Sequence, residues 1–398
     1  MNSRKGALND LKIIDLTRVL GGPYCTQILG DNGAEIIKIE PPQGDETRNW
    51  GPPFRDGEAA YFMGVNRNKK SIALNLRSEG GRQVLLRLLE DADILIENYK
   101  TGSMERWGLG YEEVLKDRFP KLIHLRVSGY GADGPYGGLP GYDGIVQAVA
   151  GMMSVNGDPQ SGRMRIGVPL VDLGTGLFAA IALLSAIHER HKSGLGQYID
   201  MALYDCAVAF MHPHVGNNAI SDEIPGLTGN SHPNLAPYDK FQTKTCEIFL
   251  GAGNNRAFKF LCENLDCEEL LDDPRFRENS DRLKNKDILF DILEEILATV
   301  DGHQLSMILS KAGIACGPLL DTDEVMSSEH TAHRDMVVKK DGYTGFGNPV
   351  KLQRTPGEVQ CIPPRFSQHA REILLNAGYS EAEIDTLIEQ NAVVTERR

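Results

Sequence analysis

The sequence predicts an α/β fold whose first domain contains a mainly parallel β-sheet. Residues 11–16 are typical of a strand, residues 22–33 of a helix and residues 34–40 of a second strand. Two strands joined by a helix lie in one sheet as a parallel, right-handed unit. The same alternation of strand-like and helix-like stretches continues to about residue 130. Sheets of this kind bind ligands beyond the carboxyl ends of their strands.

The continuing alternation supplies the other strands of the predicted sheet. Residues 71–76 and 93–98 are short apolar runs of strand length, and residues 78–92 between them have the apolar spacing of a helix. Residues 121–130 predict a further strand. Residues 129–144 contain seven glycines and two prolines, so we expect a long loop whose backbone can approach a ligand closely.

The second half of the chain predicts a change of domain. Residues 172–193 are typical of a long apolar helix, whereas residues 218–237 are polar and rich in turn-forming residues. A predicted hairpin at residues 240–253 precedes helices between residues 255 and 313. The predicted division is a large domain of residues 1–217 and 330–398, a smaller α+β domain of residues 225–325, and connections at about residues 218–224 and 326–329.

The composition indicates a globular protein that binds neither nucleic acid nor membranes. Of the 398 residues, 41% are hydrophobic and 24% are charged, and the net charge is −13. A negative surface repels nucleic acid and anionic membranes, so we expect neither as a partner. The seven cysteines form no CxxC pair, which is typical of free thiols in a reducing cytosol. With no apolar leader and no run of about 18 apolar residues, we expect a cytoplasmic location and no membrane span.

Asp172 is the candidate catalytic residue. It stands alone among apolar and small residues in the stretch RIGVPLVDLGTGLFAAIAL, where a strand-like run meets the long predicted helix. One interpretation is that Asp172 is the N-cap of this helix. The other is that amide donors and the helix dipole keep the carboxylate ionised, so that it can attack a carbonyl group as a nucleophile. The residues around Asp172 leave both interpretations open.

Two further clusters are candidate ligand sites. The basic run at residues 66–71, with Lys38 and Arg77, predicts either a phosphate site or a set of exposed cations. Asn98 and Tyr99 end a predicted strand and precede Arg106, which indicates either the ligand edge of the sheet or ordinary turn chemistry.

The sequence favours neither a metal nor a nicotinamide cofactor. His188 and His191 have helical spacing, but no carboxylate or cysteine pattern accompanies them, so we expect no metal site. A GxGxxG fingerprint after a strand is also absent from the sequence.

Five motifs, in order and at compatible spacing, resemble the class III CoA-transferase family of the CaiB/BaiF type. They are the run IDLTRVLGGPYCTQILGDNGAEIIKIEPPQGDETRNWGPPF, NRNKKSIALNL, DILIENYKTGSMERWGLGYE, SGYGADGPYGGLPGYDG and GVPLVDLGTG. The resemblance is close from about residue 8 to residue 250 and looser to the end. It implies a Rossmann-like CoA-binding domain, an interlocked homodimer in which each ring-shaped subunit is threaded by the other, and CoA as a substrate with no permanently bound cofactor.

The resemblance also implies roles for individual residues. Asp172 matches the aspartate nucleophile of the family. The positions that match its CoA-binding residues are Val19, Leu20, Lys38, Leu74, Arg77, Asn98, Tyr99, Ser103, Arg106 and Tyr130. The chain departs from the formyl-CoA transferases at three positions: Leu20 replaces a glutamine, Pro41 an arginine and Ser128 a lysine.

The implied reaction moves CoA from an acyl-CoA, for which succinyl-CoA is the expected donor, to a short carboxylic or dicarboxylic acid through an aspartyl-CoA thioester. A dicarboxylic acid has a second carboxylate, which needs a cation or amide group to bind it. Our candidates for the acid site are Arg48, Tyr142, Arg165 and His232.

Two alternative functions have distinct sequence signatures. A sibling branch racemises 2-methylacyl-CoA and needs an acid and a base on opposite faces of the α-carbon, supplied by a GHD motif. The matching triplet here is Gly141–Tyr142–Asp143, which lacks the histidine. A non-catalytic acyl-CoA-binding protein is the other alternative, and the intact Asp172 motif argues against it.

Overall fold

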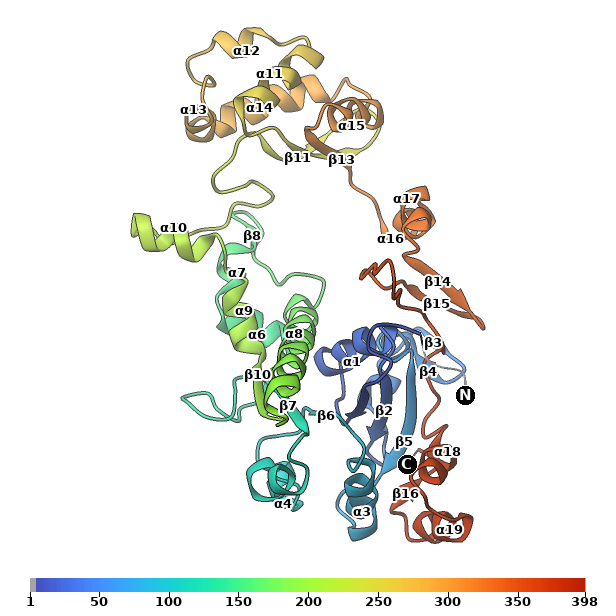
Figure 1. Ribbon diagram of the computed structural model, residues 1–398. Helices are drawn as coiled ribbons and strands as arrows, with labels where there is room; N and C mark the ends of the chain where they lie inside the picture. The colour runs from blue at the N-terminus through green and yellow to red at the C-terminus, as the bar shows by residue number, and fades with distance from the viewer. Residues whose placement is uncertain (1–4, 398) are drawn as a thin grey trace. The chain divides into compact units, whose positions relative to one another are not determined.

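The computed structural model describes residues 5–397 and divides them into two compact units (Figure 1). The first unit comprises residues 5–152, Ile166–His212 and residues 329–397, and the second comprises Met153–Arg165 and Pro213–Ser328. The sequence predicted a single central segment for the small domain, whereas the second unit also includes Met153–Arg165. A backbone hydrogen bond from Gly229 N–H to the Gly157 carbonyl, 2.9 Å long, joins the two segments of this unit.

The first unit is built on a seven-stranded sheet. Its strands, in spatial order, are β10 (Tyr198–Ala202), β7 (Ile123–Ser128), β6 (Ile94–Glu97), β1 (Lys12–Asp15), β2 (Glu35–Glu40), β5 (Lys69–Leu74) and β16 (Val393–Val394). Neighbours pair in parallel except for β16, which is antiparallel to β5. The predicted α/β class with a mainly parallel sheet is therefore confirmed.

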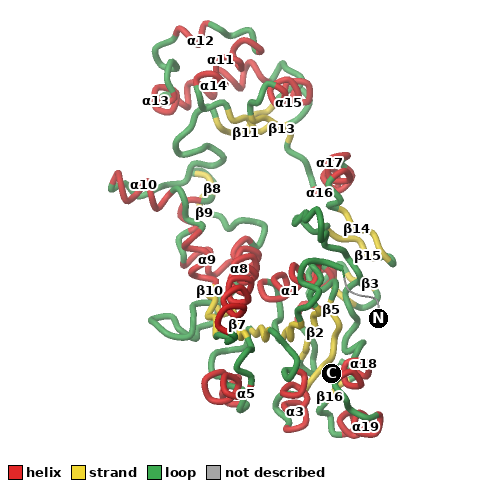
Figure 2. The backbone as a smooth tube through the Cα atoms, viewed as in Figure 1, coloured by secondary structure: helices red, strands yellow, loops and turns green. Residues whose placement is uncertain are grey.

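The strands bury both of their faces because apolar residues occupy successive positions. Ile13 packs on one face of the sheet and Ile14 on the other, as alternate strand residues must. Helices cover both faces (Figure 2). The core on the Ile14 side includes α3 (Glu79–Leu88), α18 (Ala370–Asn376) and α19 (Glu381–Glu389), and the core on the Ile13 side includes α1 (Gly21–Asp31), α8 (Leu170–Ser193) and α9 (Leu203–Ala209).

Helix α8 is apolar and long enough, by length and composition, to cross a membrane. Asp172, Thr175 and Ser185 interrupt its apolar sequence, and half of its most apolar window is buried inside the protein, as in a core helix. Gly176 allows α8 to approach α1 closely, since a Cβ at this position would lie 2.7 Å from the Gly21 carbonyl oxygen. This close contact sets the position of the α8 N-terminus at the sheet.

Shorter elements complete the first unit. They are β3 (Phe54–Arg55), β4 (Glu58–Ala59), α2 (Ala60–Met63), α4 (Ser103–Arg106), α5 (Lys116–Arg118), α6 (Asp143–Val149), α17 (Glu329–His333), β14 (Val337–Lys340), β15 (Tyr343–Phe346), a 3₁₀ helix at Glu46–Asn49 and a π-helix at Tyr111–Leu115; α7 (Met152–Val155) crosses the boundary between the units.

The second unit contains the predicted hairpin and helices. Strands β11 (Tyr238–Gln242), β12 (Glu247–Gly251) and β13 (Ala315–Pro318) form an antiparallel sheet. The other elements are β8 (Gly157–Asp158), β9 (Gly162–Arg163), α10 (His214–Ser221), α11 (Asn255–Asn264), α12 (Glu269–Asp272), α13 (Asn279–Lys284), α14 (Lys286–Leu297), α15 (Gly302–Lys311) and α16 (Thr322–Ser327). Phe258, Leu261 and Leu293 are among the residues of its separate hydrophobic core.

Candidate active site

A cavity of about 360 Å³ lies at the carboxyl ends of the central strands of the first unit. The order of strands reverses at this point, because β2 follows β1 on one side and β6 flanks it on the other. Doubly wound sheets bind ligands at such a switch point. The lining residues are Arg18–Gly22 after β1, Glu46, Asn98–Thr101 after β6, Val127–Gly129 at the end of β7, Gly138–Tyr142, Asp172 and Leu203.

Asp172 is the third residue of α8 and lines this cavity. The N-terminus of α1 lies directly against it. A Cβ added at Gly21 would be 3.2 Å from the Asp172 carbonyl oxygen and 3.8 Å from its Oδ1 atom, so glycine keeps this approach open. The fold therefore brings together a carboxylate and the free backbone amides of a helix start.

Asp143 caps helix α8, so the interpretation of Asp172 as the N-cap is wrong. The helix begins at Leu170, and the backbone amides of Val171 and Asp172 donate to Asp143 Oδ2 over 2.8 and 3.2 Å. Gln147 Nε2 donates to the other oxygen of Asp143 over 2.6 Å. Asp143 thus accepts the amide donors that the sequence analysis assigned to Asp172.

Burial and the nearby Asp143 carboxylate together raise the pKa of Asp172 to about 7. The expectation that amide donors hold Asp172 ionised is wrong, since Asp143 accepts those donors instead. A carboxyl group with this pKa is about half ionised at pH 7. Asp172 therefore combines nucleophilic basicity with accessibility to the cavity.

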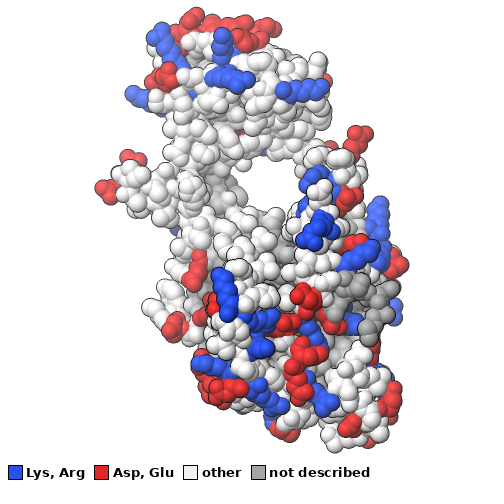
Figure 3. Space-filling view, viewed as in Figure 1, with Lys and Arg blue, Asp and Glu red and all other residues white. Residues whose placement is uncertain are grey.

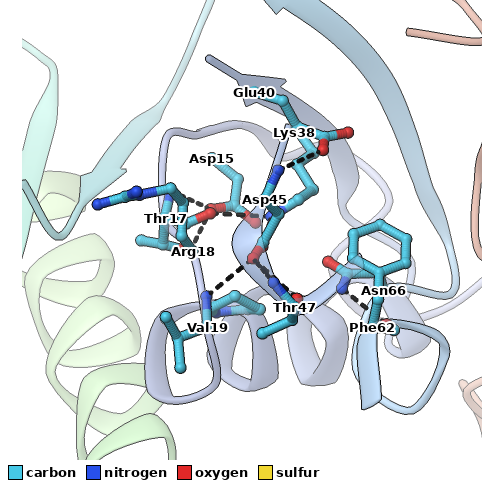
Figure 4. Close-up of polar contacts among 12 residues, drawn as sticks. Asp15, Thr17, Arg18, Val19, Lys38, Glu40, Asp45, Thr47, Phe62 and Asn66 are labelled. Atoms are coloured by element: carbon cyan, nitrogen blue, oxygen red, sulfur yellow. Dashed lines mark hydrogen bonds and ion pairs between the residues drawn. The ribbon is translucent and has the colours of Figure 1, made fainter. Parts of the chain in front are cut away.

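The loop after β1 has a strained backbone that its neighbours hold in place. Val19 has a φ of 72°, an unusual value for a β-branched residue. Arg18 N–H donates to Asn98 Oδ1 over 2.9 Å, and Asn98 Nδ2 donates to the Arg18 carbonyl over 2.7 Å. Val19 N–H donates to Asp45 Oδ1 over 3.4 Å (Figure 4). These contacts fix Val19 and Leu20, both predicted CoA-binding residues, at the cavity wall.

Lys38 holds this loop through hydrogen bonds and is not among the residues that line the cavity. Its ammonium group is fully buried and donates to Asp45 Oδ2 over 2.9 Å and to the Thr17 carbonyl over 2.8 Å (Figure 4). Burial is the largest single influence and acts to raise the pKa of Asp45, but the Lys38 charge and the hydrogen bonds from Lys38 and Thr47 together lower it. The predicted contact between Lys38 and a ligand phosphate therefore does not fit its surroundings.

The other predicted CoA-binding residues divide into two groups. Asn98 and Tyr99 line the cavity after β6, as the strand-end argument predicted. The others lie outside the lining. Leu74 is buried in the core, whereas Arg77 and Arg106 are exposed. Ser103 accepts a 2.9 Å hydrogen bond from Arg106, and the ring of Tyr130 packs against Tyr136 and Tyr204.

Of the four residues predicted to bind the acid, Tyr142 lines the cavity. The prediction for Arg48 is wrong because its guanidinium is fully buried and already paired. It lies 2.7 Å from Glu40 and 2.9 Å from Glu58, and its Cζ is 3.6 Å from the centre of the Phe62 ring. Arg165 and His232 belong to the second unit, where the His232 ring packs against Tyr238.

Sequence reasoning missed several polar residues of the site. Arg18, Glu46 and Lys100 line the cavity, and Asp143 supports Asp172. Arg18 carried a similar signal to Asn98, because it comes two residues after a predicted strand, at the ligand edge of the sheet. In the described part of the chain, no three His, Cys, Asp or Glu side chains gather as a metal site would require. Acidic and basic side chains are mixed over the face drawn in Figure 3.

The fold and the cavity define a doubly wound α/β protein with a carboxylate at its ligand-binding edge. Residues 8–370 match CoA-transferase family III, so the chain belongs to this family and is a CoA-transferase. It is 42% identical over 350 residues to an acetyl-CoA:oxalate CoA-transferase of Acetobacter aceti, covering 87% of this chain and 90% of that protein. It is 36% identical to a succinyl-CoA:glutarate CoA-transferase of Mus musculus, with 96% and 89% covered.

Solved structures show the same fold. A CaiB/BaiF family protein from Brucella suis superimposes with a TM-score of 0.86 at 36% sequence identity, covering 94% of this chain and all of that chain. The predicted membership of the CaiB/BaiF type is therefore confirmed. The bacterial and mouse relatives are named for CoA transfer, which favours that activity over racemisation and over binding without catalysis.

Proposed function

We propose that this CoA-transferase moves CoA from an acyl-CoA to a short dicarboxylic acid, with Asp172 as the nucleophile. The observation that carries this proposal is the position of Asp172, which lines a switch-point cavity against the start of α1. A carboxylate at such a point can reach a thioester whose CoA portion lies along the strand ends.

The proposed reaction proceeds through four exchanges at a carbonyl carbon. The ionised Asp172 attacks the donor thioester, a C–O bond forms, the C–S bond breaks, and CoA leaves as a thiolate from a mixed anhydride. The thiolate then attacks the Asp172 carbonyl and releases the first acid, which leaves an aspartyl-CoA thioester. The acceptor carboxylate attacks this thioester to give a second anhydride and the thiolate. The returning thiolate forms the new acyl-CoA and regenerates Asp172.

Backbone amides and glycines at the site suit this chemistry. Each tetrahedral intermediate carries an oxyanion, and Gly21, which lies beside Asp172 at the start of α1, can supply a backbone amide donor to it. Val19, Leu20, Asn98 and Tyr99 line the cavity where the CoA arm would lie. Water would hydrolyse the anhydride, and the loop at residues 129–144 supplies part of the cavity wall that excludes it.

The partners and location follow from the same proposal. Succinyl-CoA is the proposed donor because several relatives, including the mouse protein, are named for it. We also propose a cytoplasmic homodimer with interlocked subunits. Its support is an exposed apolar stripe on α8, formed by Leu177, Ile181 and Leu184 at helical spacing.

A panel of acids tests the proposed function. Purified protein is incubated with succinyl-CoA and, in separate reactions, with oxalate, glutarate, mesaconate or butyrate, and the CoA products are identified by mass spectrometry. We expect new acyl-CoA species from dicarboxylic acids, formed in equal amount to the succinyl-CoA consumed. Hydrolysis of succinyl-CoA to free CoA with no new thioester would contradict the proposal.

The pKa of Asp172 predicts the pH dependence of transfer. Only the ionised carboxylate attacks, so kcat/KM should rise with pH through an apparent pKa near 7. Burial is the larger cause of this raised value and the Asp143 charge the smaller one. Asp143→Asn keeps an oxygen that can cap α8 but removes the charge, so the acidic limb should move to lower pH. Profiles of both proteins from pH 5 to 9 measure this shift, and coincident limbs would show that Asp143 has no electrostatic effect.

A further inference from the structure

The cavity that Asp172 lines contains a cation whose charge the fold leaves largely uncompensated. Arg18 follows β1 and lines the cavity. Its Nη1 atom is 3.7 Å from Glu46 Oε1, beyond hydrogen-bond length. Its Nε atom is buried and has no hydrogen-bond partner among residues 5–397. The Arg18 side chain is 30% exposed and has only this long contact with a carboxylate, so the exposed part of its guanidinium can pair with an anion in the cavity.

Several buried cations of the first unit have close partners, unlike Arg18. Arg126 also has a buried Nε without a hydrogen-bond partner among the described residues, but it does not line the cavity. Arg48 lies 2.7 Å and 2.9 Å from two carboxylates, and Arg67 lies 2.6 Å from Asp31. Lys38 has two partners within 2.9 Å. In Figure 4 the side chain of Arg18 points away from the cluster around Lys38 that satisfies its neighbours.

Hydrogen bonds hold the backbone of Arg18, and its guanidinium lies near an aromatic ring. Asn98 makes two hydrogen bonds to the Arg18 backbone, of 2.9 and 2.7 Å. The guanidinium carbon lies 5.9 Å from the centre of the Tyr99 ring, within the range of a cation–π contact. A guanidinium that is positioned in this way presents a planar fork of donors suited to a carboxylate.

The charged residues of the cavity indicate which substrate group Arg18 would bind. The carboxylates among the lining residues are Glu46 and Asp172, and the cations are Arg18 and the exposed Lys100. The reacting carboxylate of an acceptor acid loses its charge when it forms an acyl bond, whereas a second carboxylate keeps it. A retained charge in a partly buried site needs a paired cation. Gly21 contacts Asp172 and is three positions after Arg18 in the chain, a Cα–Cα span of at most about 11 Å.

Building on the proposed function, we propose that Arg18 binds the remote carboxylate of a dicarboxylic substrate and makes the enzyme selective for dicarboxylic over monocarboxylic acids. Glu46 is the weak competitor for the same guanidinium. A phosphate group of CoA offers the same anionic chemistry, and the experiment therefore measures binding of CoA separately from the choice of acid.

The experiment compares glutarate with butyrate, which lacks only the second carboxylate, using succinyl-CoA as donor. The measured quantity is the ratio of kcat/KM for glutarate to that for butyrate in the wild type, Arg18→Gln, Arg18→Lys and Glu46→Gln. We expect the ratio to fall on the order of 30-fold in Arg18→Gln, the loss of a charge-assisted hydrogen bond. It should fall less in Arg18→Lys, which keeps the charge, and rise in Glu46→Gln, which removes the competitor.

Binding of CoA, measured by isothermal titration calorimetry, separates the two sources of the anion. A Kd for CoA that stays within threefold in Arg18→Gln, together with the lower ratio, supports the proposal. An unchanged ratio with a weakened Kd overturns it and assigns Arg18 to a phosphate of CoA. A wild-type protein that binds CoA but transfers it to neither acid overturns the proposed function, and this inference with it. A wild type that transfers to both acids with a ratio unaffected by Arg18→Gln overturns this inference alone.

Discussion

Asp172→Asn lowers CoA transfer by a factor on the order of 10⁴ or more, the loss expected when the nucleophile of a covalent mechanism is removed. The amide oxygen is too weakly basic to displace a thiolate from a thioester. The side chain keeps its shape, so the contact of Asp172 with the start of α1 is retained. The variant should therefore bind CoA normally while it fails to transfer it. Initial rates and calorimetric Kd values measure the two effects separately.

Trapping of the intermediate makes this prediction specific to Asp172. Wild-type protein mixed with succinyl-CoA and then with hydroxylamine or borohydride should be modified at Asp172, as shown by peptide mass mapping. Asp117→Asn is the matched control, because Asp117 is an exposed carboxylate on α5 outside the cavity lining. It should be labelled and should turn over like the wild type. Normal turnover in Asp172→Asn would end the covalent mechanism proposed for this residue.

Arg48→Ala lowers the free energy of unfolding at pH 7 by about 3–5 kcal/mol, the cost of leaving buried carboxylates without their partner. The fully buried guanidinium donates to Glu40 from Nε and Nη2, both over 2.7 Å, and lies 2.9 Å from Glu58. Burial acts to raise the pKa of Glu40, but the hydrogen bond and charge of Arg48 lower it below its usual value. Without Arg48, burial would dominate and the pKa of Glu40 would rise.

The pH dependence of this loss follows from the direction of that change. In the wild type, the lowered pKa of Glu40 means that its stabilising contribution is present above its unfolded pKa and is lost as the pH falls. In Arg48→Ala a raised pKa reverses the sign, so the deficit relative to the wild type should shrink as the pH falls from 7 toward 5. Urea unfolding at both pH values measures it. Arg82→Ala, which breaks the exposed pair with Glu79, is the control and should change little. A variant as stable as the wild type would contradict the role given to Arg48.

The local pattern of the sequence was sufficient for the fold class and for part of the site. Strand-like and helix-like stretches alternate over the first 130 residues, and strands joined by helices lie in one sheet as parallel neighbours, which was sufficient to predict the parallel sheet. Because parallel strands place their carboxyl ends at one edge, the positions of Asn98 and Tyr99 at the end of a strand made them candidates for the ligand side, and the family resemblance assigned both to CoA binding. The family resemblance singled out Asp172, which indeed lines the cavity.

Only the tertiary structure decided how each charged residue is used. Asp143 and Asp172 are 29 positions apart, so the sequence could not show that Asp143 accepts the amides of α8 and raises the pKa of its neighbour. Arg48 and Arg18 carry the same charge, yet Arg48 is buried between two carboxylates, whereas Arg18 lines the cavity and lies 3.7 Å from Glu46. Hydrophobic periodicity is a local property that the chain carries along its length. Desolvation and charge pairing depend on which distant groups meet after folding, and these determine which ionisable side chains remain available for chemistry.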